Sequence, residues 1–274
     1  MKTGHLEILS TLILPDWPAP ARVQACCTTR EGGVSRAPYG TLNLGDHVGD
    51  DPAAVAENRA RLVRALGLPE MPRWLNQVHG CAAVNVAEAP PGCSADVAYT
   101  DRPGIVCAVL TADCLPVLLC DRQGTRVAAI HAGWRGLAAG AIEAGVRALG
   151  VSRKEILAWL GPAIGPQAFE VGAEVRKVFV GHDPLAARAF RPAPGGRWLA
   201  DLHVLAQQRL AECGVTAVYG DRWCTYSEPA RFFSYRRDGA TGRMATIIWL
   251  GRDGDAAPLR TLRVQGSGNQ NFIE

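Results

Sequence analysis

Apolar and β-branched runs separated by turn residues dominate the middle of the chain and predict buried strands. Three such runs cover residues 104–110, 115–120 and 126–131, and Asp121-Arg122-Gln123-Gly124 provides a turn between the last two. A fourth run covers 156–160. Continuous apolar runs of this length are typical of strands that are buried on both faces of a sheet.

Helical spacing of apolar residues appears in three other segments. The segment after Asp51 is predicted to be a helix, because an Asp can cap its start and Pro52 suits its first turn. An alanine-rich helix is predicted over 137–149 and another over 199–213, each followed by a glycine that can end it.

The C-terminal third adds a strand over 215–219 and a hairpin formed by 231–237 and 243–250 around a glycine-containing turn. Strands, hairpins and helices alternate without a regular βαβ order, which argues against Rossmann and TIM topologies. We therefore expect a mixed α/β fold, with helices packed on a mixed β-sheet, in one domain over 1–264. Residues 265–274 are expected to be a polar tail, frayed or derived from cloning.

Composition and charge fit a folded enzyme-sized domain. The chain has 274 residues, of which 48% are hydrophobic, and its formal net charge is +3. This balance predicts no nucleic-acid or membrane partner. The N-terminal apolar stretch is too short to span a bilayer and lacks a cleavage site, and the nine cysteines form no CxxC pair. We expect a cytoplasmic protein with reduced thiols.

Polar residues with metal-binding or nucleophilic chemistry interrupt the apolar runs at three places. They are Asn76-Gln77-Val78-His79-Gly80, Thr111-Ala112-Asp113-Cys114 and His131-Ala132-Gly133-Trp134-Arg135-Gly136. If these segments converge, His79, Cys114 and His131 supply two imidazoles and one thiolate. Such a set suits Zn(II) with a fourth position open to water or substrate.

Three other interpretations of these residues stay open at this point. They could be hydrogen-bonded residues of the core. They could form a metal-free pair in which Cys114 is a nucleophile beside His131, with Asp113 orienting the imidazole. They could also belong to a non-catalytic zinc module, whose fourth ligand would be Cys81, Cys107, Cys120 or Cys224.

Several further polar residues are candidate contacts for a substrate or a phosphate. Arg30, Arg135 and Arg236 adjoin glycine-containing loops, where planar guanidinium groups suit a phosphate or carboxylate. Asn43 and Gln77 are candidate substrate contacts, although Asn43 could equally cap a turn. The remaining histidines, His5, His47, His182 and His203, are expected to be structural.

Taken together, these segments resemble the YfiH family, whose members are also known as laccase-domain proteins, polyphenol oxidases, purine nucleoside phosphorylases or peptidoglycan editing factors. The resemblance begins at Thr28-Thr29-Arg30-Glu31-Gly32-Gly33-Val34-Ser35, runs through the three motifs above, and ends at Ser234-Tyr235-Arg236-Arg237-Asp238-Gly239. It implies an α/β sandwich distantly similar to toxin-type cysteine hydrolases. It also places His79, Cys114 and His131 at the positions of the family's metal ligands.

The resemblance implies several activities: phosphorolysis of adenosine, inosine and methylthioadenosine, deamination of adenosine, copper-dependent oxidation of phenols, and removal of misincorporated L-Ser from a peptidoglycan precursor. A multicopper oxidase needs more histidine ligands than the six histidines here can supply, so Cu(II) fits only as a substitute for Zn(II). We expect a zinc-dependent purine nucleoside phosphorylase with adenosine deaminase activity, in which Asp113 and Cys114 are catalytic. The editing amidase is the alternative, phenol oxidation a side activity, and the oligomeric state is left open.

Overall fold

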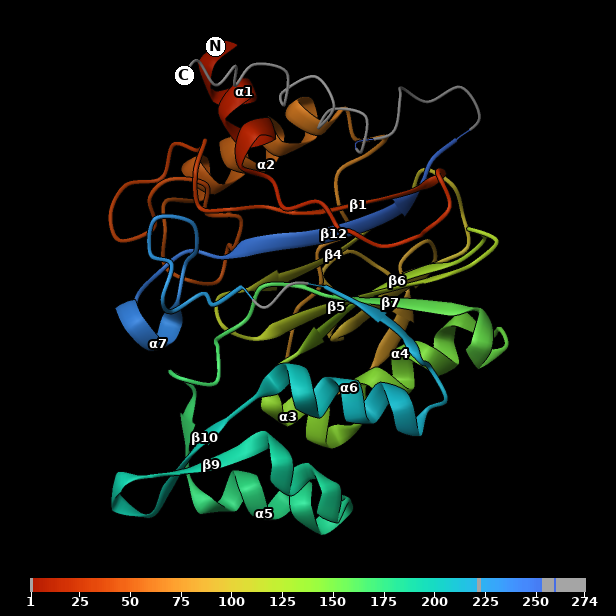
Figure 1. Cartoon of the computed structure of the whole chain (residues 1–274). Coiled ribbons are helices and arrows are strands. Elements are labelled where there is room, and N and C mark those ends of the chain that lie inside the picture. The colour runs from red at the N-terminus through yellow and green to blue at the C-terminus, as the bar shows by residue number, and fades with distance from the viewer. Residues whose placement is uncertain (1, 221–222, 253–258, 260–274) are drawn as a thin grey trace, which may run out of the picture.

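Two β-sheets lie face to face in the middle of the molecule, and helices cover both outer faces (Figure 1). The computed structural model describes residues 2–220, 223–252 and 259. The mixed α/β fold predicted from the sequence is confirmed.

The smaller central sheet has three antiparallel strands in the order β1-β12-β4. Its strands are β1 (Val23–Cys27), β12 (Met244–Leu250) and β4 (Val106–Thr111). Every residue of β12 and β4 is buried. This burial on both faces explains why the two segments lack the alternating pattern of an exposed sheet.

The larger central sheet has six strands in the order β11-β7-β5-β6-β3-β2. They are β11 (Ala217–Tyr219), β7 (Ile156–Leu160), β5 (Leu115–Asp121), β6 (Val127–Ala132), β3 (Val97–Thr100) and β2 (Ala83–Asn85). The central pairs are antiparallel, and the edge strands β11 and β2 each pair in parallel with a neighbour. A short turn after β4 leads into β5, so the chain crosses here from one sheet to the other.

Three apolar clusters separate the layers of this sandwich. One lies between the two sheets and includes Cys107, Leu118 and Ile248. A second packs the outer face of the smaller sheet against α2 (Pro52–Leu66), beside which lies α1 (Lys2–Thr11). The third packs the outer face of the larger sheet against α3 (Trp134–Ala139), α4 (Ala141–Leu149) and α6 (Leu202–Glu212).

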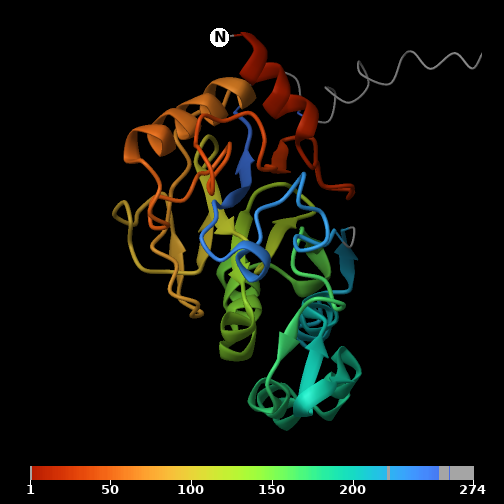
Figure 2. The same ribbon diagram turned by 90° about the vertical axis from the view of Figure 1, so that its left-hand side faces the viewer.

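A small lobe extends beyond α3 and α6, at the bottom of Figure 1 and Figure 2. It contains the three-stranded sheet β8-β10-β9 and the helix α5 (Ala173–His182). The strands are β8 (Glu170–Val171), β9 (Phe190–Ala193) and β10 (Arg197–Ala200). The short helices η1 (Arg153–Glu155), η2 (Pro184–Ala189) and η3 (Pro194–Gly196) complete the connections on this side of the molecule.

Four predicted strands and the capped helix are present. The strands predicted over 104–110, 115–120, 126–131 and 156–160 correspond to β4, β5, β6 and β7. The side chain of Asp51 accepts a hydrogen bond from the backbone N–H of Ala53 and caps α2, and Gly67 ends that helix in the left-handed conformation. The apolar runs and the capping residues were sufficient to predict these elements, because the local sequence preferences agree with the burial of each element in the fold.

The predicted C-terminal hairpin is wrong. Residues 231–234 form no strand, and α7 (Tyr235–Asp238) follows them. The strand β12 pairs instead with β1 and β4, which are distant in the sequence. The Ser234 side chain accepts a hydrogen bond from the backbone N–H of Arg237 and caps α7, so a capping residue replaces the expected turn chemistry.

Two predicted helices have different bounds. The helix predicted over 137–149 is two helices, because Gly140 adopts φ 92° and ends α3 before α4 begins. The helix predicted over 199–213 begins only at Leu202, because the preceding residues pair as β10.

The other early expectations concern cysteines, membranes and the tail. All nine cysteines lie within the described residues, where none forms a disulfide, and four of them are buried. No helix in the described ranges is both long and apolar enough to cross a membrane. The predicted tail over 265–274 and the side chain of His5 lie outside the described residues.

Candidate metal centre

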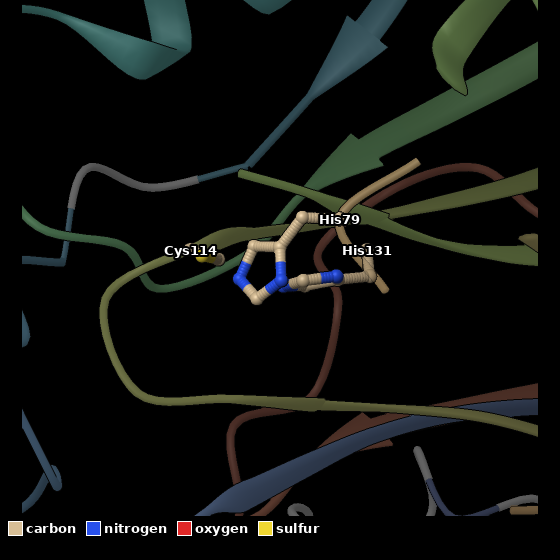
Figure 3. Close-up of side chains that lie close together, drawn as sticks. All are labelled: His79, Cys114 and His131. Carbon is tan, nitrogen blue, oxygen red and sulfur yellow. The ribbon is translucent and has the colours of Figure 1, made fainter. Parts of the chain in front are cut away.

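His79, Cys114 and His131 meet although the first and the last are 52 positions apart in the chain. Their donor atoms all lie within 4.8 Å of one another, and the two imidazole ring centroids are 4.7 Å apart. Figure 3 shows the Cys114 sulfur facing the two histidine rings. His79 is exposed and His131 is buried, so solvent reaches the group from the His79 side.

Each donor is carried by a different part of the sandwich. His131 is on β6, and Cys114 lies in the turn between β4 and β5. His79 lies in the loop that precedes β2 and has φ 60°, a left-handed conformation that few non-glycine residues adopt. Such strain is kept only where surrounding contacts fix it, and it is common at functional sites.

Asp96 provides those contacts. Its buried carboxylate accepts hydrogen bonds from the backbone N–H groups of Val78, His79 and Gly80, at 3.2, 3.0 and 2.7 Å. Its Oδ1 atom also lies 2.8 Å from Nδ1 of His131. One carboxylate therefore fixes the loop that carries His79 and the ring orientation of His131, leaving Nε2 of His131 to face Cys114.

Gly133 keeps the space between the donors open. A Cβ atom at this position would lie 2.8 Å from the Cys114 sulfur and 3.3 Å from Cδ2 of His79. A side chain here would therefore fill the region into which the donors point. The glycine is required by close approach and not by a special backbone angle.

The electrostatics of the group favour a thiolate. Burial opposes ionisation of Cys114, but the charge of His131 and hydrogen bonds from both imidazoles outweigh it and lower the pKa of the thiol to about 6. Burial also opposes the charged form of His131, but the Cys114 thiolate and the hydrogen bond to Asp96 raise its pKa to about 9. Metals bind thiolates and not thiols, so the site is prepared for a cation.

The residues fit a transition-metal ion. Two imidazoles and a thiolate are donors that zinc and copper accept, and the three donor atoms lie within 4.8 Å of one another. Among the described residues, no fourth His, Cys, Asp or Glu joins the group. The fourth ligand expected for a closed zinc module is thus not found in the part of the chain that the structure describes.

Asp113 does not orient His131, because Asp96 occupies that position. The Oδ1 atom of Asp113 accepts from the hydroxyl of Thr225, and Oδ2 accepts from the backbone N–H of Arg236, both at 2.7 Å. Asp113 has φ 100° and is almost fully buried. It therefore joins the Cys114 turn to two C-terminal loops. Its predicted part in proton transfer stays a prediction.

The polar groups of the predicted ligand-binding residues mostly contact the backbone. Arg30 donates to the carbonyls of Gly40 and Pro229. Asn43 bonds Gly45 and the backbone N–H of Arg243, and Gln77 makes two hydrogen bonds with the backbone of Leu110. Arg236 donates to the carbonyl of Glu170, while Arg135 is exposed and stacks on Trp134. Their roles toward a substrate stay predictions.

Two charged residues near the centre were missed by the sequence analysis. Asp96 acts through backbone groups 16 to 18 positions away, which no local motif reveals. The only signal is a carboxylate directly before the apolar strand Val97–Thr100. Arg243 directly precedes β12 and was assigned to a hairpin, which concealed its place near Cys114.

Comparison with known proteins gives relatives that span most of the chain. The sequence pattern of a family described as multi-copper polyphenol oxidoreductase laccase matches residues 24–251. A purine nucleoside phosphorylase of Pseudomonas aeruginosa is 57% identical over 245 residues, covering 88% of this chain and 99% of that protein. The purine nucleoside phosphorylase YfiH of Escherichia coli is 55% identical over 243 residues, covering 88% of this chain and 100% of that protein.

Solved structures show the same fold. A Neisseria meningitidis protein has a TM-score of 0.85 and 52% identity, covering 88% of this chain and 100% of that one. A YfiH protein of Bacillus licheniformis has a TM-score of 0.81 and 31% identity, covering 88% of this chain and 96% of that one.

Proposed function

The chain belongs to the family described as multi-copper polyphenol oxidoreductase laccase, and from its relatives there we propose that it is a metal-dependent purine nucleoside phosphorylase. The observation that carries the proposal is identity above 50%, over nearly their full length, to proteins that bear this name. The open three-donor group supports it, because a site with three protein ligands leaves room for a substrate.

In this proposal His79, Cys114 and His131 hold Zn(II), which Cu(II) could replace. Zinc supplies a Lewis acid that polarises a substrate oxygen or holds a phosphate. Asp96 holds the two imidazoles in place through its hydrogen bonds to His131 and to the His79 loop. Asp113, next to Cys114, is the proposed proton carrier and would exchange its hydrogen bond from Thr225 to do so.

The proposed reaction transfers the sugar from a purine to inorganic phosphate. A phosphate oxygen forms a bond to the anomeric carbon while the bond from that carbon to the purine nitrogen breaks, and the released purine takes up a proton. Adenosine, inosine and methylthioadenosine are the proposed substrates. Deamination of adenosine to inosine is proposed as a second activity of the same centre.

A second candidate, the editing amidase, is favoured by one specific observation. Cys114, His131 and Asp96 form a hydrogen-bonded series like the nucleophile, base and orienting acid of cysteine hydrolases. A free thiolate that attacks an amide and a thiolate that binds a metal exclude each other at Cys114. The presence or absence of metal in the active protein therefore separates the two functions.

The family's description as multi-copper does not fit the donor set. A multicopper oxidase needs several further histidines around additional ions, whereas this chain has six in all. Among the described residues there is one group that could hold a metal. Phenol oxidation by a single substituted copper is at most a side activity in our proposal.

The test measures metal content and adenosine turnover together, in buffer with and without phosphate. We expect about one zinc per chain, phosphate-dependent release of adenine, and loss of both metal and turnover in Cys114→Ala. Cys213→Ala, which alters a thiol at the end of α6 outside the donor group, is the matched control and should keep both.

Two results would contradict the proposal. Full turnover by metal-free protein would remove the metal mechanism and favour Cys114 as a nucleophile. Bound zinc without phosphate-dependent turnover of any of the three nucleosides would exclude the phosphorylase.

A further inference from the structure

Arg243 lies beside the metal centre because of strand pairing. It directly precedes β12, whose first residue, Met244, pairs with Thr111 at the end of β4. Cys114 follows Thr111 by three residues in the adjoining turn. The antiparallel register thus brings Arg243 next to the turn that carries the thiolate. Figure 1 shows α7 at this same end of the smaller sheet.

The charge of Arg243 interacts with anionic groups of the site. Burial lowers the pKa of Arg243, and the Cys114 thiolate and the Asp113 carboxylate act in the opposite direction. Burial lowers the pKa of His47, and the positive charge of Arg243 lowers it further, so the His47 imidazole lies near this guanidinium. These interactions agree with the strand register in placing the guanidinium near the turn that carries Cys114.

The Arg243 side chain is held in place, yet part of its hydrogen-bonding capacity is unused. Its Nη1 atom donates to the carbonyls of Thr241 and Gly242, both at 3.0 Å. Gly45 makes room for the side chain, since a Cβ there would lie 2.8 Å from Cγ of Arg243. Within the described residues, no carboxylate lies in ion-pair range of Arg243, and no acceptor contacts its Nε or Nη2 atom.

Neighbouring arginines do not share this arrangement. Arg237 forms an ion pair with Asp238 and donates to three backbone carbonyls. Arg30 donates through two nitrogens to carbonyls. Arg236 carries a donor near Asp113, but that donor is its backbone N–H. Arg243 thus combines partial burial, a fixed position and unused donors beside the centre.

We propose that Arg243 binds the inorganic phosphate that attacks the nucleoside. This inference rests on the proposed function and makes it more specific. It assigns phosphate binding to Arg243, which is not one of the three arginines predicted from the sequence to bind phosphate. Two N–H groups of one guanidinium can contact two phosphate oxygens at once. A divalent ion on one thiolate leaves a net positive charge, so the metal would add to the attraction.

The kinetic test compares Arg243→Gln and Arg243→Lys with the wild type in phosphate-free buffer to which phosphate is added. Loss of hydrogen bonds to a charged ligand should raise the KM for phosphate about 10- to 100-fold in Arg243→Gln. The KM for adenosine and the metal content should change little, and Arg243→Lys should recover part of the loss. Arg188→Gln removes an exposed arginine on η2 and should behave as the wild type.

Equilibrium binding of inorganic phosphate, measured by calorimetry on the same proteins, separates this inference from the proposed function. One possible result is that the wild type binds phosphate, Arg243→Gln does not bind it, and neither protein cleaves a nucleoside. That result supports the phosphate site and contradicts the phosphorylase proposal. If Arg243→Gln is folded, retains its metal and binds phosphate as the wild type does, the inference is overturned whatever the activity.

A measurement on the wild type does not depend on how the variants fold. Phenylglyoxal modifies arginine side chains, and bound phosphate should slow the labelling of Arg243 severalfold, as read by peptide mass spectrometry. Labelling of the exposed Arg188 should be the same with and without phosphate. Equal labelling of Arg243 in both conditions would overturn the inference.

Discussion

A single carboxylate, Asp96, organises two of the three candidate metal donors. Replacing it by Asn keeps the shape but removes the charge and one acceptor, which weakens its hold on His131 and on the amides of the His79 loop. Carboxylates behind a metal-bound histidine typically account for 10- to 100-fold in affinity. We predict that Asp96→Asn lowers zinc affinity by about this factor, as measured by competition with a chromophoric chelator.

Asp121→Asn is the matched control for this prediction. Asp121 is equally buried and accepts hydrogen bonds from the backbone N–H groups of Thr125 and Arg126, in the turn between β5 and β6. It is expected to lose stability without losing metal affinity. Equal zinc affinity in Asp96→Asn and the wild type would show that Asp96 has no part in metal binding.

The Cys114–His131 pair makes the stability of the metal-free protein depend on pH, with a loss on acidification. The Cys114 pKa is lowered from 9.0 to about 6, so its contribution is complete above 9.0 and is lost as the pH falls through about 6. The His131 pKa is raised from 6.5 to about 9, so its contribution is complete below 6.5 and is lost as the pH rises through about 9. Between pH 6.5 and 9.0 the two contributions change in opposite directions and largely cancel, so the net loss of stability falls at low pH, where the Cys114 thiolate takes up a proton.

Urea unfolding of chelated wild type and Cys114→Ser, at pH 5, 7.5 and 10, checks this prediction. The difference in the free energy of unfolding between the two proteins should be smaller at pH 5, where the thiol is protonated, than at pH 7.5, and should change little from pH 7.5 to 10. Cys93→Ser changes a thiol outside the donor group and should give a difference that does not follow this profile. An equal difference at pH 5 and pH 7.5 would be inconsistent with an ionised Cys114 thiol in the folded protein.

At the scale of residues, the sequence could indicate donor chemistry but not the groups that support it. His79, Cys114 and His131 stand in compact motifs at the ends of apolar runs, and these motifs led to the zinc hypothesis. Asp96 and Arg243 act through contacts that exist only after distant segments pair. A carboxylate that binds backbone amides leaves no side-chain pattern to detect.

Elements whose signals are local were predicted well, and those that depend on pairing were not. The buried strands β4, β5 and β6 are recognisable from their composition alone. The segments around β12 looked like a hairpin because a glycine-containing turn lies between two apolar runs. The actual partners of β12 are β1 and β4, and partner choice depends on the core between the sheets.

The start of α2 offers a prediction at the scale of one element. The Asp51 side chain accepts a hydrogen bond from the backbone N–H of Ala53 at 2.9 Å. This bond satisfies one of the N–H groups in the first turn that have no partner within the helix. Asp51→Ala should lower the free energy of unfolding by about 1 kcal/mol, whereas Asp51→Ser should recover most of it. Denaturant unfolding measures both. An unchanged midpoint for Asp51→Ala would mean that the cap contributes nothing to the fold.

At the scale of the whole molecule, the position of the donor group links its chemistry to the stability of the sandwich. Cys114 lies where the chain crosses from the smaller sheet to the larger one, and His131 belongs to a central strand of the larger sheet. His79 comes from the loop before an edge strand. The sequence could place these residues at strand ends, but it could not show that the crossing brings them together.

A metal held at this crossing should stabilise both sheets together, because it binds only the folded arrangement of the three donors. A ligand present at a thousand times its Kd stabilises a protein by about 4 kcal/mol, and in a chain of this size that corresponds to a rise in Tm of roughly 10 °C. We predict a fall of this order on chelation and full recovery on adding zinc, measured by calorimetry. Cys114→Ala should show neither change, since one of the donors is missing. If elemental analysis shows that chelation has removed the metal from the wild type and its Tm equals that before chelation, the group does not join the sheets through a metal. The apolar core between the sheets alone then fixes their contact.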